Sequence, residues 1–126
     1  MTKPQVLLVE DSLIALQIEK SILEGLDCRV DCVENGEKVV DMAKKTSYHL
    51  ILMDIGLPGM NGIQACQAIR QDEINSKKPT VPVVAVTANT DNAQHELCKK
   101  VGMKEVVTKP LTEEKAKNLL DDIKIC

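Results

Sequence analysis

Short apolar or alternating runs are interspersed along the chain with segments in which apolar residues recur at helical spacing. The runs occupy residues 6–9, 28–33, 50–53, 81–86 and 105–108. The run at 50–53, Leu-Ile-Leu-Met, contains no polar residue, which is typical of a strand buried on both faces. Helical spacing follows each run in turn, at residues 13–26, 39–43, 63–69, 92–101 and 112–123. The pattern predicts five strands alternating with five helices.

Residues at the ends of these segments predict where the helices begin and end. Residue types that commonly cap helices precede three of them: Ser12 or Asp11, Asn61, and Thr112. Gly25 and Gly102 are expected to close the first and fourth helices. Asn35 and Gly36 are expected to form a turn, because Asn-Gly is a frequent turn dipeptide.

The alternation of short strands and helices predicts an α/β fold. Such repeats form a parallel sheet with right-handed crossovers and helices on both faces. We expect a doubly wound, flavodoxin-like sheet of order 2-1-3-4-5, in which ligands bind outside the carboxyl ends of the strands. The chain has 126 residues, an ordinary length for one domain, so residues 1–126 are expected to form a single domain.

Polar residues lie where the predicted strands end. Glu10 and Asp11 follow the first strand, and Asp54 follows the third. Thr87 follows the fourth strand and Lys109 the fifth. In a parallel sheet these ends meet at one edge. Carboxylates ~5 Å apart repel by roughly 3 kcal/mol per pair at an effective dielectric constant of 20, so three of them require a cation or a proton.

This residue set suits phosphoryl transfer. Carboxylate oxygens without His or Cys favour Mg²⁺ or Mn²⁺ as the cation. Lys109 offers a positive charge and Thr87 a hydroxyl donor, while a carboxylate serves as nucleophile. The protein's task in such a transfer is mainly positioning and charge neutralisation.

Four segments, taken together in this order and spacing, resemble the receiver domain of two-component response regulators. They are residues 6–12 (VLLVEDS), 50–62 (LILMDIGLPGMNG), 83–89 (VVAVTAN) and 108–110 (TKP). The resemblance extends over essentially the whole chain. It implies a signalling switch or phosphorelay intermediate that catalyses its own aspartyl phosphorylation and dephosphorylation. It also implies a histidine kinase or a histidine phosphotransfer protein as partner.

The resemblance implies roles for individual residues. Asp54 corresponds to the aspartate that accepts the phosphoryl group. Asp11 corresponds to the main acidic Mg²⁺ ligand, with Glu10 beside it acting partly through water. The backbone carbonyl of Gly56 would be a further metal ligand.

On the other side of the site, Thr87 would donate a hydrogen bond to the phosphoryl group, and Lys109 would contact a phosphoryl oxygen. The bond between Lys109 and Pro110 would be cis. Position 106 is a departure, because the family usually has Tyr or Phe there and this chain has Val106. Two further positions tune phosphoryl lifetime in the family, and here they are Gly56 and Asn89.

Several alternatives stay open. The domain could be a free-standing response regulator, which a start at Met1 favours, or part of a hybrid histidine kinase, which residues 85–89 and 102–103 resemble. A flavin or nucleotide binding module could use the same architecture. Its first loop would have to cradle phosphate, whereas Glu-Asp-Ser-Leu at 10–13 repels phosphate without a metal, and no Gly-x-Gly-x-x-Gly or Walker motif is present. A phosphatase with an aspartyl nucleophile would need an acid at Gly56.

The composition disfavours several classes of binding partner and indicates the cellular compartment. A net charge of −3 argues against nucleic-acid binding, and the chain has no Phe or Trp and one Tyr. No apolar run approaches the ~20 residues of a membrane helix, and no signal peptide is evident, so no membrane contact is expected. Five cysteines without a Cys-x-x-Cys motif indicate reduced thiols in a cytoplasmic protein. The oligomeric state, the cognate kinase and the output stay open.

Overall fold

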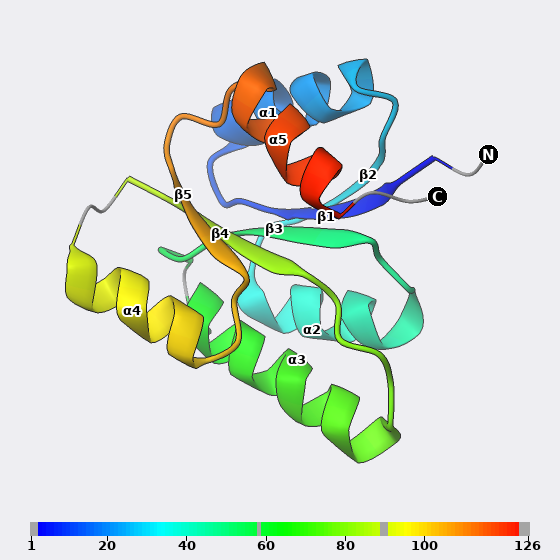
Figure 1. Ribbon diagram of the computed structural model, residues 1–126, viewed down its shortest axis with the longest axis vertical. Helices are drawn as coiled ribbons and strands as arrows, with labels where there is room; N and C mark the ends of the chain where they lie inside the picture. The colour runs from blue at the N-terminus through cyan, green and yellow to red at the C-terminus, as the bar shows by residue number, and fades with distance from the viewer. Residues whose placement is uncertain (1–2, 58, 89–90, 124–126) are drawn as a thin grey trace.

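The computed structural model describes residues 3–57, 59–88 and 91–123. Within them, five parallel strands form one sheet of order β2-β1-β3-β4-β5, which confirms the predicted order (Figure 1). The strands are β1 (Gln5–Val9), β2 (Arg29–Val33), β3 (Leu50–Asp54), β4 (Val83–Thr87) and β5 (Glu105–Thr108). The predicted α/β fold is therefore confirmed.

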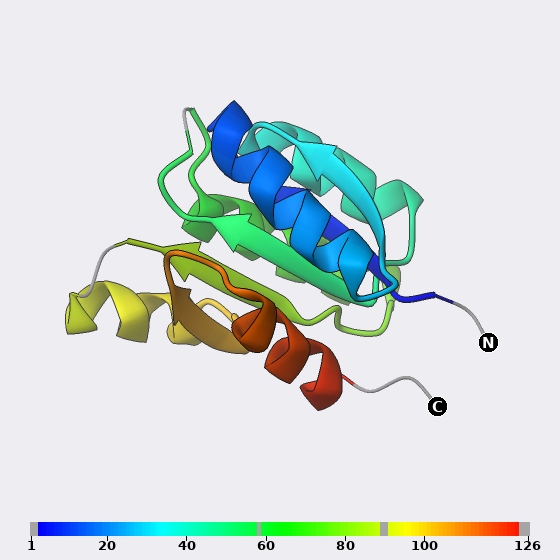
Figure 2. The same cartoon turned by 90° about the horizontal axis from the view of Figure 1, so that it is seen from above.

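Helices cover both faces of the sheet. On one face lie α1 (Leu13–Gly25) and α5 (Glu113–Asp122), and on the other lie α2 (Gly36–Lys45), α3 (Gly62–Ser76) and α4 (Asn92–Lys100) (Figures 1 and 2). Alternate residues of the central strands enter two separate apolar clusters. Leu7, Ile51 and Met53 belong to the cluster under α2 and α3, whereas Leu8 and Leu52 belong to the cluster under α1 and α5.

The position of a strand in the sheet explains its sequence pattern. Every residue of β3 and β4 is buried, because both strands have neighbours on each side and helices on each face. The edge strand β2 alternates between exposed and covered residues. A central strand of a parallel sheet therefore reads as an unbroken apolar run, and an edge strand does not.

Two strand boundaries differ from the expected ones. The fourth strand begins at Val83, where pairing with Ile51 starts, and not at Val81. Pro82 lacks an amide hydrogen and contributes only its carbonyl, which accepts from the Ile51 amide at 2.9 Å. The second strand begins at Arg29, because the Cys28 amide still donates to Leu23 at the end of α1.

The expected turn at Asn35 and Gly36 is the start of α2. Asn35 is the N-cap, and its side-chain oxygen accepts from the Lys38 amide at 2.9 Å, so the helix begins three residues before position 39. The expected caps Ser12, Asn61 and Thr112 are present at α1, α3 and α5.

Both expected glycines lie at helix ends, but only Gly102 adopts a positive φ. Gly102 follows α4 with a φ of +105°, a conformation that residues other than glycine rarely adopt, and it lies against the Arg70 side chain. Gly25 is the last residue of α1, but the left-handed residue beyond it is Asp27, with a φ of 65°.

The described cysteines carry free thiols. Cys28, Cys66 and Cys98 are buried, and Cys32 is half-buried. Cys126 lies outside the described residues. A search of the described residues finds no helix with the length and hydrophobicity that crossing a bilayer requires.

Candidate functional site

The carboxyl ends of the strands bring the predicted site residues to one edge of the sheet. Glu10 directly follows β1, and its amide continues the ladder by donating to Val33 at 3.2 Å. Asp54 is the last residue of β3, and Thr87 is the last residue of β4. In the register of these strands Asp54 pairs with Val86, so Thr87 lies one position further out.

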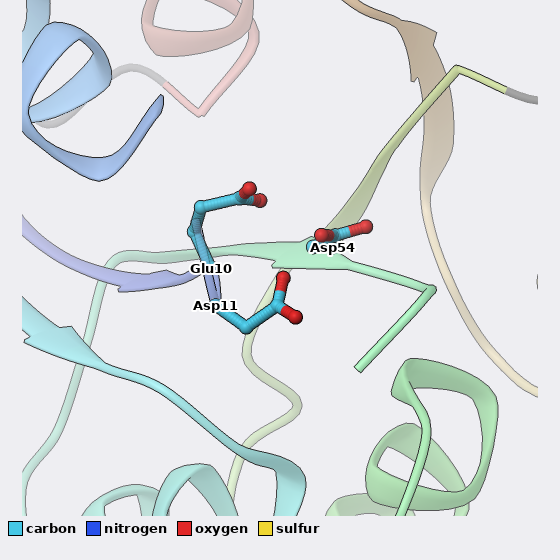
Figure 3. A group of neighbouring side chains, drawn as sticks. All are labelled: Glu10, Asp11 and Asp54. Carbon is cyan, nitrogen blue, oxygen red and sulfur yellow. The ribbon is translucent and has the colours of Figure 1, made fainter. Parts of the chain in front are cut away.

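Three carboxylates cluster at this edge. Glu10, Asp11 and Asp54 each offer an oxygen, and these atoms lie within 4.8 Å of one another (Figure 3). Glu10 and Asp54 are only 3% and 8% exposed, whereas Asp11 is exposed. The sequence expectation that these acids converge is therefore confirmed.

Lys109 reaches the same cluster from the loop after β5. Its Nζ lies 3.2 Å from Glu10 Oε2, 3.3 Å from Glu10 Oε1 and 3.3 Å from Asp54 Oδ2. The Lys109 amide donates to the Thr87 carbonyl at 2.8 Å, which fixes the start of this loop against β4. The Lys109–Pro110 bond is cis, as the resemblance implied.

The site carries an excess of negative charge. Burial, together with the neighbouring Asp54 carboxylate, raises the pKa of Glu10 to about 7, although Lys109 opposes this shift. Burial acts to lower the pKa of Lys109, but the carboxylates of Asp54 and Glu10 outweigh it and the net pKa is raised. Among the described residues, Lys109 is the one cation paired with these acids, so a second cation would be strongly favoured.

Gly56 contributes its backbone to the site. The Gly56 amide donates to Asp54 Oδ1 at 3.1 Å, so Asp54 is held by this amide on one oxygen and by Lys109 on the other. A Cβ at Gly56 would stand 3.9 Å from Asp54 Oδ1, so the glycine places no side chain in van der Waals contact with this oxygen. The assignment of the Gly56 carbonyl as a metal ligand stays a prediction.

Two other predicted positions have different outcomes. Val106 lies on β5 opposite Ala85 and is half-buried against the cluster under α2 and α3. The lifetime-tuning position Asn89 lies outside the described residues.

A surface on α1 beside the site was not predicted from the sequence. Leu13, Ile14 and Ile18 are 68%, 73% and 56% exposed. The only signal in the sequence was an excess of apolar residues beyond one inward stripe. Glu19, the residue after Ile18, has a buried carboxyl group whose pKa is raised by burial, and nothing in the sequence pattern marked it.

Comparison with known proteins identifies the family. The family model of the response regulator receiver domain matches residues 6–121. The chain belongs to this family. It is 37% identical over 115 residues to the histidine-protein kinase BarA of Escherichia coli, covering 91% of this chain and 12% of BarA. Sensor protein GacS of Pseudomonas syringae is 34% identical over 110 residues, covering 87% of this chain and 12% of GacS. The receiver thus spans about an eighth of these curated relatives.

Solved receiver structures agree with the fold. The receiver domain of sensor histidine kinase PA1611 from Pseudomonas aeruginosa is 31% identical, with a TM-score of 0.85 over 96% of this chain and 97% of that one. That structure has a magnesium ion coordinated in its active-site cleft. A complex of the yeast phosphotransfer protein Ypd1 with the Ssk1 receiver matches at 31% identity and a TM-score of 0.81, covering 96% and 86% of the chains.

Proposed function

We propose that this receiver domain, residues 1–126, accepts a phosphoryl group from a phosphohistidine onto Asp54 in a Mg²⁺-dependent reaction. The observation that carries the proposal is the surroundings of Asp54. Its carboxylate contacts Lys109 and lies within 4.8 Å of the Glu10 and Asp11 carboxylates. The donor would be a histidine kinase or a histidine phosphotransfer protein, and the receiver would act as a switch or a phosphorelay intermediate.

The residues of the site fit a magnesium ion. Three carboxylates with one lysine leave a surplus of negative charge, and hard oxygen ligands suit Mg²⁺, with Mn²⁺ as a substitute. We assign Glu10, Asp11, Asp54 and the Gly56 carbonyl as the groups that hold the ion. When bound, the ion supplies positive charge that neutralises the transferred phosphoryl group.

The chain's own residues position the reaction. An Asp54 oxygen attacks phosphorus, the bond from phosphorus to the donor imidazole nitrogen breaks, and the imidazole leaves with that electron pair. Gly56 and Lys109 hold the Asp54 carboxylate from two sides and restrict its rotation. We assign Lys109 and Thr87 to the oxygens of the phosphoryl group once it is on Asp54.

The apolar surface on α1 is proposed as the docking surface for the phosphohistidine partner. It consists of Leu13, Ile14 and Ile18, and it starts two residues after Asp11, so it adjoins the site. A partner whose apolar helical surface covers it would present its histidine to Asp54. The solved complex of Ypd1 with the Ssk1 receiver supports a phosphotransfer protein as partner.

Incubation with acetyl phosphate and Mg²⁺, followed by intact mass measurement, tests the proposal. We expect one added phosphoryl group in the parent protein, and none in Asp54→Asn or after addition of EDTA. Asp41→Asn removes an exposed aspartate on α2 and should behave like the parent. A hydroxylamine-sensitive phosphoryl group on Asp54→Asn would contradict the assignment.

The cellular setting follows as part of the proposal. We propose a cytoplasmic phosphorelay, in which the domain acts alone or within a larger histidine kinase. The alternative of a flavin or nucleotide module finds no support at this edge, because the first loop carries Glu10 and Asp11 where a phosphate would have to bind.

A further inference from the structure

The loop between β3 and α3 contains Gly56 near its start, and α2 contacts the loop near its end. Within the loop, the Leu57 and Gly62 amides both donate to the Ile55 carbonyl, at 3.0 and 3.1 Å. Gly62 lies against β3 so closely that a Cβ there would stand 2.7 Å from the Asp54 carbonyl oxygen. These contacts fold the loop back onto the end of β3.

Glu37 on α2 provides a contact from outside the loop. Its Oε1 accepts from the Met60 amide at 3.0 Å, across 23 positions of sequence. The same oxygen would stand 3.3 Å from a Cβ at Gly59, whose φ is +70°. The carboxylate of Glu37 therefore lies against two successive residues of the loop.

The backbone of α2 approaches the loop at the same point. A Cβ on Gly36 would collide with the Met60 carbonyl oxygen, so only glycine permits this approach. Met60 itself packs on the apolar cluster under α2 and α3. The first turn of α2 and the end of the loop are therefore in direct backbone contact, and Glu37 closes that contact with a hydrogen bond.

We infer that Glu37 is a positioning residue for the metal site, acting through the β3–α3 loop. By holding Met60, it keeps the loop in the conformation that places Gly56 beside Asp54. This inference rests on the proposed function, because it concerns the Mg²⁺ affinity of that same site. Groups that orient metal ligands typically change affinity 10–100-fold when removed. Glu37 is exposed and acts one step further away, so we expect a weakening of roughly three- to tenfold.

Glu37 also lies in the first turn of α2, where any acidic residue stabilises a helix. The test must separate this effect from the loop contact. Glu114 occupies the same second position of α5, as Glu37 does of α2, and is exposed. Glu114→Ala is therefore a matched control, and Glu37→Gln keeps an acceptor oxygen for the Met60 amide.

Calorimetric titration with Mg²⁺, combined with ¹⁵N-glycine NMR spectra of the metal-free protein, tests the inference. We expect Glu37→Ala to raise the Mg²⁺ dissociation constant and to shift the Gly56 and Gly59 amide signals. Glu37→Gln should restore both, and Glu114→Ala should change neither.

If Glu37→Ala binds Mg²⁺ as tightly as the parent protein, the inference about Glu37 is wrong while the proposed function stands. The same conclusion follows if Glu114→Ala loses as much Mg²⁺ affinity as Glu37→Ala. A parent protein that takes no Mg²⁺ would overturn the proposed function as well.

Discussion

The edge of the sheet at which the strands begin (the amino edge) and the edge at which they end (the carboxyl edge) differ in how buried polar side chains are paired. At the amino edge, Glu73 is 6% exposed and its two oxygens accept from Arg70 at 2.8 Å and from the Val81 amide at 2.7 Å. Nearby, the Tyr48 hydroxyl donates to Asp31 at 2.6 Å. The buried Glu73 and Tyr48 side chains therefore both have partners within the fold.

The carboxyl edge is incomplete by comparison. Glu10 and Asp54 share the ammonium of Lys109, and burial with the Asp54 charge raises the pKa of Glu10 to about 7. Perturbed groups of this kind gather where a protein acts on a ligand. The difference teaches that a buried carboxylate marks function only when the fold leaves its charge uncompensated.

The largest expected effect is at the amino edge. Glu73→Ala removes the acceptor of the half-buried Val81 amide and the partner of Arg70. Because a donor with little access to water is costly to leave unsatisfied, we expect a loss of about 1–3 kcal/mol in the free energy of unfolding. Urea denaturation measures it, with Glu96→Ala on the exposed side of α4 as control. A loss below that of the control would contradict the view that Glu73 completes this edge.

At the carboxyl edge, neutralising an acid should stabilise the metal-free protein. The pKa of Glu10 is raised to about 7 from an ordinary value of 4.5, so its contribution to stability is fully present below pH 4.5 and is lost as the pH rises to 7. In EDTA, we expect Glu10→Gln to gain stability relative to the parent across this interval and then to level off. Thermal unfolding between pH 4 and 8 measures the difference, and parallel curves would show that Glu10 titrates normally.

Magnesium should raise the free energy of unfolding by binding the acids at the carboxyl edge, and it should not affect the side chains at the amino edge. At a Mg²⁺ concentration ten times the dissociation constant, mass action stabilises the fold by about 1.4 kcal/mol. Thermal unfolding with and without Mg²⁺ should show this gain in the parent protein and in Glu96→Ala. Asp11→Ala should lose it, because Asp11 is one of the three clustered acids. If Mg²⁺ leaves the thermal stability of the parent protein unchanged, the assignment of this edge as a metal site is wrong.

Much of the carboxyl edge could be predicted from the sequence. Central parallel strands are buried on both faces, so β3 and β4 appeared as apolar runs, and the residue after each run had to lie at one edge. Asp54, Thr87 and Lys109 were therefore placed without a structure. Local signals were less certain, since Asn35 and Gly36 suit a turn and a helix start equally well.

What the sequence could not supply depends on which elements pack together. Leu13, Ile14 and Ile18 fit a helical pattern, but α1 packs on the sheet and α5 with only one side. The contact of Glu37 with Met60 joins residues 23 positions apart and follows from the course of the β3–α3 loop. The α1 surface left only an excess of apolar residues as a signal in the sequence, and the contact of Glu37 with Met60 left none.

The smallest expected effect concerns how far a structural change at the phosphorylated site extends through the protein. In the resembled family, an aromatic ring at position 106 fills the space vacated when the strand-4 hydroxyl moves toward the phosphoryl group. Here Val106 is half-buried beside Ala85, and a valine has few rotamers and is too short to connect the site with the face of α4, β5 and α5. Two states differ only as far as their contacts differ, so the face of α4, β5 and α5 should change little.

Chemical shifts with and without beryllofluoride measure this transmission. We expect the largest changes around Asp11, Ser12 and the start of α1, which also carries the exposed Leu13 and Ile14, and small changes over residues 92–108. Val106→Tyr supplies the missing ring and should extend the changes onto β5 and α4, while phosphorylation by acetyl phosphate proceeds as in the parent. Largest shifts over residues 92–108 in the parent would show that other side chains around Thr87 carry the motion. Phosphorylation would then change the face of α4, β5 and α5 without an aromatic residue at position 106. The start of α1 would no longer be the expected binding surface for partners that recognise the phosphorylated protein.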